Sequence, residues 1–402
     1  MINESDSFLQ TMHDILNKNM VKIKQNNMIA SLLVLISTLC FCVTLIGSNV
    51  FAVNAHYEHI ESSAQGMVTM EVSTKTVIYQ KNPHKKLPMA STTKILTAIT
   101  VVENIADLDK KIKIPKEAVG VEGSSIYLQS GEELTVLDLL YGLMLQSGND
   151  CAVALAILTS GSVEKFSALM NETARKIGAK NSNFTNPHGL HESEHYTTAY
   201  DLALISAHSL ENPVFAEIVR AKKYSAPWEG REYDRIIINK NKLLNQYDGA
   251  DGVKTGFTRK AGRCFVGSAT RENMQVVCVV INCGPMFAES ENLMTRTFNE
   301  YSMEQVLYPA QEFGAVNVEK GKNETTRIGV VSQRFFPLKQ GMLDRVEYKT
   351  KIDENISAPL NAGDRVGTLE VLLNGKIIIK ELLVTLEDVP SRNIWDRLKD
   401  II

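Results

Sequence analysis

The sequence has little net charge, few cysteines, no internal repeat and no low-complexity tract. Its 402 residues include 43 Lys and Arg against 46 Asp and Glu, which gives a formal net charge of −3 at pH 7. A general nucleic-acid binder depends on a strong positive field, so this balance argues against that class. The length predicts two or three domains and is ample for a hydrophobic core.

The six cysteines do not form the pattern of a disulfide framework. Cys40 and Cys42 lie in an apolar run near the N-terminus, and neither follows the small residue that a lipoprotein processing site needs. The other four lie in apolar segments: Cys151, Cys264, Cys278 and Cys283. We therefore expect buried free thiols in the rest of the chain.

An apolar run extends from Met28 to Ile46, with lysines before it and the small-residue segment Val53-Asn54-Ala55 after it. This order is typical of an export signal that is cleaved after Ala55. The run is also long enough to cross a bilayer, so a retained anchor stays open. We assign residues 1–55 to a signal peptide or an N-terminal anchor.

A loop that runs into a helix contains Ser91 and Lys94. Apolar residues recur at helical spacing after them, so one face of the helix is expected to be buried. Ser91 and Lys94 then project to the same side within one turn. Serine is a weak nucleophile that needs a base, and lysine acts as one when burial or another cation lowers its pKa. The alternative is that Ser91 only caps the helix and that Lys94 is solvated.

Two further short motifs follow along the chain. Ser147-Gly148-Asn149 lies in a tight turn between two apolar helices, where polar side chains could face a cleft. Because all three are turn formers, a plain helix–helix turn is the alternative. Lys254-Thr255-Gly256 opens a run of strands, and alone it could be an ordinary turn before a strand.

In this order the three motifs resemble the signature of the penicillin-binding proteins and serine β-lactamases. More narrowly, the sequence is similar to the low-molecular-weight D-alanyl-D-alanine carboxypeptidases of serine peptidase family S11. The resemblance covers about residues 60–390. It includes the segments around the motifs and two others, Asn186-Pro187-His188-Gly189-Leu190 and Ala362-Gly363-Asp364-Arg365-Val366.

The resemblance implies an α/β (α+β) transpeptidase-like domain, with an antiparallel sheet flanked by helices, followed by a small all-β domain. We place the catalytic domain at 56–310 and the β-rich domain at 323–388. Asn374-Gly375 between alternating apolar residues predicts a hairpin in the latter. Residues 389–402 are expected to form an amphipathic helix, which could lie in a membrane surface or dock on the protein itself.

The resemblance also implies the chemistry. The catalytic side chains would be Ser91, Lys94 and Ser147. The substrate-binding set would be Asn149, Lys254, Thr255, Gly256 and Phe257. The enzyme would remove the terminal D-Ala from peptidoglycan stem peptides through an acyl-enzyme, with β-lactams as inhibitors. It would work at the outer face of the cytoplasmic membrane or in the cell wall of a bacterium. The resemblance implies no metal and no cofactor, and we expect no nucleic-acid partner.

Three other interpretations were weighed against this one. A class A β-lactamase carries Asp in the middle of the second motif, where this chain has Gly148, and it needs a deacylating Glu for which no clear candidate is found. A catalytically weak wall-binding scaffold has no need of all three motifs. A Ser-His-Asp triad through His188 is disfavoured because Ser91 already has a lysine partner. By resemblance, His188 borders the cleft and Asp201 supports that region.

Overall fold

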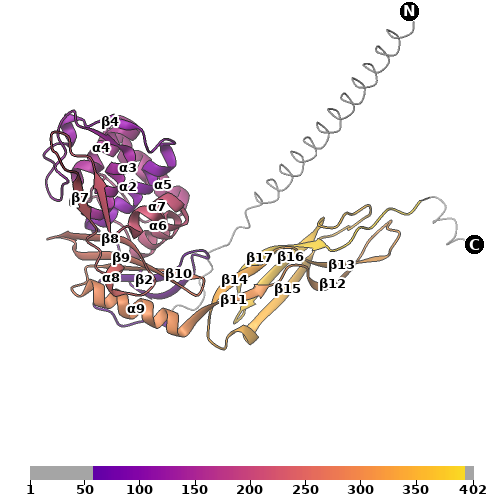
Figure 1. The fold of residues 1–402 in the computed structure, drawn as a ribbon. Coiled ribbons are helices and arrows are strands. Elements are labelled where there is room, and N and C mark those ends of the chain that lie inside the picture. The colour runs from indigo at the N-terminus through magenta and orange to yellow at the C-terminus, as the bar shows by residue number, and fades with distance from the viewer. Residues whose placement is uncertain (1–57, 394–402) are drawn as a thin grey trace, which may run out of the picture. The chain divides into compact units, whose positions relative to one another are not determined.

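The computed structural model describes residues 58–393 (Figure 1). Residues 58–300 build a six-stranded sheet in the order β1-β3-β2-β10-β9-β8. Its strands are β1 (Glu58–His59), β2 (Gly66–Glu71), β3 (Val77–Lys81), β8 (Ala250–Thr258), β9 (Gly262–Arg271) and β10 (Met274–Ile281). All neighbours are antiparallel except the short β1–β3 pair. Strand β8, which carries the third motif, lies at an edge of this sheet.

Helices cover both faces of the sheet. On one face, the helices that contact the strands are α2 (Lys94–Asn104), α6 (Ala199–Glu211) and α7 (Pro213–Arg220). The same hydrophobic cluster extends to α3 (Val136–Tyr141), α4 (Asn149–Ser160) and α5 (Val163–Ile177). The other face packs against α8 (Leu243–Gln246) and α9 (Met286–Glu300). Two-stranded ribbons, β4 (Lys111–Lys113) with β5 (Glu133–Thr135) and β6 (Lys223–Ala226) with β7 (Arg235–Ile238), complete this part.

The alternation of side chains along β2 explains the two cores. Val68 and Met70 point into the cluster shared with the helices on one face, while Met67 points into the cluster shared with α9. In the sequence, alternation and β-branched residues over 66–71 and 76–79 predict a hairpin, and the antiparallel pairing of β2 with β3 confirms it. The four cysteines of the described residues are buried free thiols, as expected.

The apolar pattern before the second motif predicts one helix over residues 134–146, and the structure differs from it in three details. Leu134 pairs with Ile112 and so belongs to β5. The helix starts only after Thr135, whose side chain forms a capping box with Asp138. Its last turn, Gly142–Gln146, widens into a π-helix before the second motif. Among the described residues no single helix is long and apolar enough to cross a membrane, and only α4 and α5 together, bent by 83°, pass that test.

Residues 301–393 consist of strands and turns with one short 3-10 helix, Leu343–Arg345, so the predicted all-β class of the C-terminal domain is confirmed. β11 (Tyr301–Leu307) pairs with β14 (Arg334–Lys339), and five strands form a sheet in the order β12-β13-β17-β16-β15. Their bounds are β12 (Gln311–Asn317), β13 (Thr325–Val330), β15 (Val346–Ile352), β16 (Arg365–Leu373) and β17 (Lys376–Thr385). The Asn374-Gly375 hairpin between β16 and β17 is confirmed. Val389 and Ser391 form isolated β-bridges, and the rest of the predicted terminal helix lies outside the described residues.

Candidate active site

Ser91 lies in a short 3-10 turn, Ala90–Thr93, which we call the Ser91 turn. The hydroxyl groups of Thr92 and Thr93 donate to the carbonyls of Met89 and Ala90, at 2.7 and 2.9 Å, and tighten the turn. Helix α2 begins only at Lys94, and no side chain caps it. The expectation that Ser91 occupies an N-cap position is therefore wrong, which removes the capping interpretation of this serine.

Lys94 is fully buried at the start of α2. Its Nζ lies 3.2 Å from Ser91 Oγ, 2.7 Å from Asn149 Oδ1 and 2.7 Å from the His188 carbonyl oxygen. The Lys94 side-chain nitrogen thus connects the first motif, the second motif and the 185–190 loop. The predicted pair of Ser91 and Lys94 is in hydrogen-bonding contact.

Burial lowers the pKa of Lys94 well below its ordinary value, and the nearby Lys254 cation lowers it further. Burial also lowers the pKa of Lys254, to about 7, with a smaller effect from the Lys240 cation. Each effect disfavours the charged form of a lysine. A neutral Lys94 amine has two hydrogens and one lone pair, so it can donate to Asn149 Oδ1 and the His188 carbonyl while it accepts from Ser91.

The second motif is held by backbone geometry and by a buried carboxylate. Ser147 adopts a left-handed conformation, with φ of 66°, at the end of the π-helical turn, and α4 starts at Asn149. Both side chains are buried, Ser147 to 5 % exposure and Asn149 to 3 %. The amide of Asn149 is fixed because Nδ2 donates to the Glu122 carbonyl while Oδ1 accepts from Lys94.

Asp150, which the sequence analysis did not select, holds the loop opposite this turn. It accepts hydrogen bonds from the backbone nitrogens of Ile126 and Leu128, at 3.0 and 3.2 Å, and from the Ser125 hydroxyl. The same loop provides the Glu122 carbonyl that orients Asn149. Its position one residue beyond the second motif is the only sequence signal that could have identified Asp150.

The third motif runs along β8 beside the Ser91 turn. A Cβ on Gly256 would lie 3.0 Å from the Ser91 backbone nitrogen and 3.1 Å from that of Thr92, so the strand approaches the turn closely only because this residue is glycine. Lys254 is 1 % exposed, and its Nζ donates to the Thr255 carbonyl at 3.0 Å. Phe257, one residue further, is 64 % exposed.

Lys240 is a third lysine of this region that sequence reasoning missed. It follows β7, and its Nζ donates to the Gln146 carbonyl at 2.8 Å, directly beside the second motif. Its charge lowers the pKa of Lys254. Nothing in the segment Asn239-Lys240-Asn241 distinguishes this lysine from a solvated one, so only the fold identifies it.

The 185–190 loop contributes through its backbone. The His188 carbonyl accepts from Lys94, whereas the His188 imidazole accepts from the Leu190 backbone nitrogen. Asp201 accepts from the Asn181 backbone nitrogen and the Ser182 hydroxyl, so it supports the start of this region from α6. No Ser-His-Asp arrangement forms between the described side chains of Ser91, His188 and Asp201.

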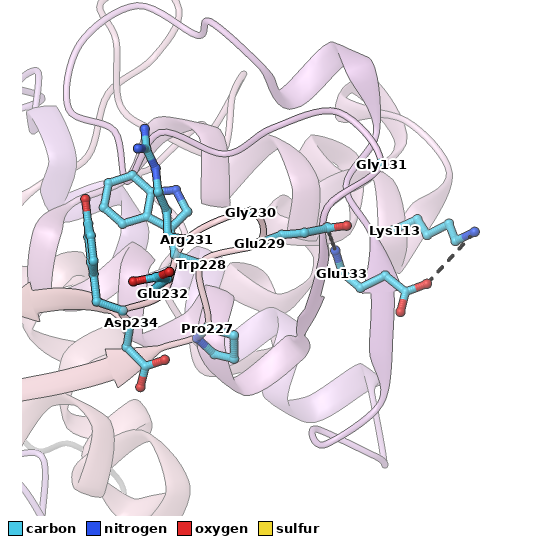
Figure 2. Close-up of a pocket in the computed structure, with 11 residues that line it drawn as sticks. Lys113, Gly131, Glu133, Pro227, Trp228, Glu229, Gly230, Arg231, Glu232 and Asp234 are labelled. Atoms are coloured by element: carbon cyan, nitrogen blue, oxygen red, sulfur yellow. Dashed lines mark hydrogen bonds and ion pairs between the residues drawn. The ribbon is translucent and has the colours of Figure 1, made fainter.

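A pocket of about 520 Å³ lies away from these residues, between the β6–β7 connection and the β4–β5 ribbon (Figure 2). It is lined by Trp228, Tyr233 and charged residues, among them Lys113 and Glu133, which form an ion pair at 3.9 Å. None of the predicted site residues lines it. Within residues 58–393, no group of three or more His, Cys, Asp or Glu is placed to hold a metal ion.

Replacing Lys254 with methionine should stabilise the protein near pH 7. The folded state binds its proton with a pKa of about 7, while the unfolded chain keeps the ordinary value near 10.5. Between these values the unfolded state binds more protons, so the wild-type free energy of unfolding rises with pH through that window. Methionine removes the buried charge, and we expect a gain of about 1–4 kcal/mol at pH 7 that shrinks toward pH 10.5.

Urea unfolding of both proteins at pH 7 and pH 10 measures this gain. The matched control is Lys260→Met, because Lys260 is exposed in the turn after β8. Equal stability of wild type and Lys254→Met at pH 7 would contradict the argument.

Comparison with known proteins agrees with this geometry. A family described as D-alanyl-D-alanine carboxypeptidase (Peptidase_S11) matches residues 51–284, and one described as penicillin-binding protein 5, C-terminal domain, matches residues 301–391. The D-alanyl-D-alanine carboxypeptidase DacF of Bacillus subtilis is 31 % identical over 351 residues, which cover 84 % of this chain and 88 % of that protein. DacC of Escherichia coli is 30 % identical over 375 residues, which cover 89 % and 92 %.

Solved structures of the same kind share the fold. Penicillin-binding protein 5 from Haemophilus influenzae superposes with a TM-score of 0.71 at 29 % identity, covering 83 % of this chain and 99 % of that one. Penicillin-binding protein 6B from Escherichia coli gives 0.66 at 25 % identity, covering 84 % and 99 %. With its three motifs gathered around one buried lysine, the chain belongs to the S11 family of D-alanyl-D-alanine carboxypeptidases and is a serine D-Ala-D-Ala carboxypeptidase of the penicillin-binding protein 5 type.

Proposed function

We propose that the reaction proceeds through an acyl-enzyme on Ser91, with Lys94 as the base. The contact of Lys94 Nζ with Ser91 Oγ at 3.2 Å is the observation that carries this assignment. Ser91 Oγ attacks the carbonyl between the last two D-alanines of a stem peptide, and its proton passes to the neutral Lys94 amine. The bond to the terminal D-Ala breaks as its nitrogen takes up a proton. Water then hydrolyses the ester and frees Ser91.

Ser147 would carry the proton to the leaving amine. Its burial between the π-helical turn and α4, two residues before Asn149, supports this role. Asn149 keeps the Lys94 amine oriented through Oδ1 and contributes to binding the substrate amide. This geometry also supports proton transfer from Ser91 to Lys94. Both hydrogens of the neutral Lys94 amine are donated, one to Asn149 Oδ1 and one to the His188 carbonyl, so its lone pair is left for the Ser91 proton.

The substrate would lie along the free edge of β8. Lys254 and the Thr255 hydroxyl bind its terminal carboxylate, which restricts the enzyme to the last residue of the peptide. Gly256 lets the substrate backbone approach as an added strand. The backbone N–H groups of Ser91 and Phe257 form the oxyanion hole, and the close approach of Gly256 to the Ser91 nitrogen supports this placement.

The test of the proposed function is D-alanine release from a pentapeptide ending in D-Ala-D-Ala, using residues 56–402. A parallel sample with benzylpenicillin is digested, and mass spectrometry locates the adduct. Release together with an adduct on the peptide that contains Ser91 is expected. Rapid penicillin turnover without D-alanine release would instead favour a β-lactamase, and a stable adduct without release would favour a wall-binding role.

We also propose that the protein is exported and acts on peptidoglycan at the outer face of the cytoplasmic membrane. The apolar run from Met28 to Ile46 and the small residues that follow it support export, and so does the substrate. We further propose that residues 56–310 form the catalytic domain, residues 323–388 the β-rich domain and residues 389–402 the terminal membrane-binding segment. The amphipathic pattern of the terminal segment supports attachment to the membrane surface.

Truncation after Asn393 should move the signal-cleaved protein from the membrane fraction to the soluble fraction. The cut retains the β-bridges at Val389 and Ser391, so the β-rich part keeps its closing contacts. Fractionation followed by immunoblotting measures the change. An unchanged distribution, with signal cleavage shown by N-terminal sequencing, would rule out the terminal segment as the anchor.

A further inference from the structure

His195 is a buried histidine outside the three motifs. Its side chain is 2 % exposed and contacts two segments that are far apart in the sequence. Its Nε2 lies 2.8 Å from Thr93 Oγ1, in the Ser91 turn. Its Nδ1 lies 3.1 Å from the backbone nitrogen of Thr185, at the start of the 185–190 loop. One side chain therefore joins the turn to the loop.

These contacts define which ring nitrogen carries the proton. The Thr185 N–H can only donate, so Nδ1 accepts, and the hydrogen of neutral His195 is on Nε2. That N–H donates to Thr93 Oγ1, and the Thr93 hydroxyl donates to the Ala90 carbonyl at 2.9 Å. The chain of hydrogen bonds ends on the residue directly before Ser91.

The imidazole is held in this neutral form. Burial lowers the pKa of His195 to about 4, and the groups that face it are Lys94 on α2 and His188, His191 and Glu192 on the following loop. A neutral ring can donate from Nε2 and accept at Nδ1 at once, which a protonated ring cannot do. Both hydrogen bonds are therefore present together near pH 7.

The series of hydrogen bonds from His195 ends at Ala90, a residue with a strained backbone. Ala90 has a φ of +49°, in the left-handed region that alanine rarely adopts. The 185–190 loop packs on the same peptide group, since a Cβ on Gly189 would lie 2.0 Å from the Ala90 carbonyl oxygen. Next to Gly189, the His188 carbonyl accepts from Lys94. The turn that carries the serine and the loop that orients the lysine thus meet here.

We propose that His195 is a positioning residue of the reaction. Through Thr93 it holds the strained Ser91 turn, and through Thr185 it holds the loop whose His188 carbonyl orients Lys94. A single side chain thereby keeps Ser91 Oγ and Lys94 Nζ at hydrogen-bonding distance. The inference rests on the proposed roles of Ser91 and Lys94.

Two substitutions separate the two contacts of the ring. In His195→Gln the side-chain amide nitrogen reaches about the place of Nε2, so it can still donate to Thr93. In His195→Asn the amide oxygen lies near the place of Nδ1, so it can accept only from Thr185. The partner variant Thr93→Val removes the hydroxyl that receives and passes on the hydrogen bond. Thr100→Val is the matched control, because the Thr100 hydroxyl is buried on α2, the helix that follows the Ser91 turn, and has no hydrogen-bond partner among the described residues.

The measurements are kcat and KM for D-alanine release, the rate of acylation by benzylpenicillin, and Tm. We expect His195→Asn and Thr93→Val to lower kcat and the acylation rate about 10- to 100-fold with KM little changed, as misplaced reacting groups do. His195→Gln keeps the contact with Thr93, next to Ser91, and loses only the contact with Thr185, so it should show a smaller loss than His195→Asn. The double variant His195→Asn/Thr93→Val should be no slower than the slower single variant, because both remove one contact.

Additive losses in the double variant would overturn the proposal. So would wild-type rates in both His195→Asn and Thr93→Val, or kcat losses that Thr100→Val reproduces at the same Tm. These outcomes are distinct from a failure of the proposed function, in which the wild-type protein itself would release no D-alanine or form no adduct on Ser91.

Discussion

Replacing Ser91 with alanine should lower D-alanine release by about 10⁴- to 10⁶-fold, because loss of the nucleophile removes the covalent route altogether. The fold should be unaffected, since Ser91 caps no helix and is half-buried at the surface of its turn. Covalent labelling by benzylpenicillin should disappear, while reversible binding of the substrate carboxylate remains. Coupled-enzyme detection of free D-alanine and intact-protein mass spectrometry measure the two effects.

The matched control is Ser225→Ala, because Ser225 is an exposed serine of β6 whose hydroxyl donates to Asp234. It should retain wild-type release and labelling. A penicillin adduct that persists in Ser91→Ala would contradict the assignment of the nucleophile. Mapping that adduct to Ser147 would transfer the role to the second motif.

Sequence reasoning located the chemistry because that chemistry depends on side chains at fixed spacing. A serine three residues before a lysine meets it within one turn whether the turn is α or 3-10, so the contact of Ser91 with Lys94 was predictable. The detailed backbone was not. Alanine has no preference for a positive φ, and the conformation of Ala90 follows from Gly189 packing against its carbonyl and from the bonds made by Thr93.

The partners that sequence reasoning missed act through the backbone or through long-range packing. The sequence places His188 at the border of the cleft and disfavours a catalytic role for its imidazole, and the group that meets Lys94 is its backbone carbonyl. Every residue has a carbonyl, so no sequence pattern marks this one. Asp150 and Lys240 face the site only because the 122–128 loop and β7 fold back onto the second motif. In the β-rich part, β11, β12 and β14 were missed because half-exposed edge strands lack a strong alternation.

Replacing Lys94 with arginine should lower the acylation rate by about 10²- to 10⁴-fold, the usual contribution of a general base. Arginine places a permanent positive charge at this position, because its guanidinium remains protonated at any working pH and cannot accept the Ser91 proton. A role for Lys94 as a cation alone would leave the rate of Lys94→Arg close to that of the wild type. The substitution therefore distinguishes a role of Lys94 as a general base from a role as a fixed cation.

The pH dependence provides a second, independent measure of the same group. A base must be unprotonated to react, so the wild-type rate should rise with pH through the depressed pKa of Lys94 and then level off. Lys254 is the second cause of that depression, so Lys254→Met should move this rise to higher pH because it removes the neighbouring cation. Acylation by benzylpenicillin, followed by stopped-flow from pH 4 to pH 10, measures both curves.

The direction of this shift is the decisive point. If the rise reflects the ionisation of Lys94, removing a cation beside it must make its protonated form easier to keep, and the midpoint can only move up. An unchanged midpoint in Lys254→Met would mean that another group controls the rise, and Lys94 would lose its assignment as the base. In the control Lys260→Met the lost cation is exposed and is not among the charges that lower the pKa of Lys94 or Lys254, so its midpoint should match that of the wild type.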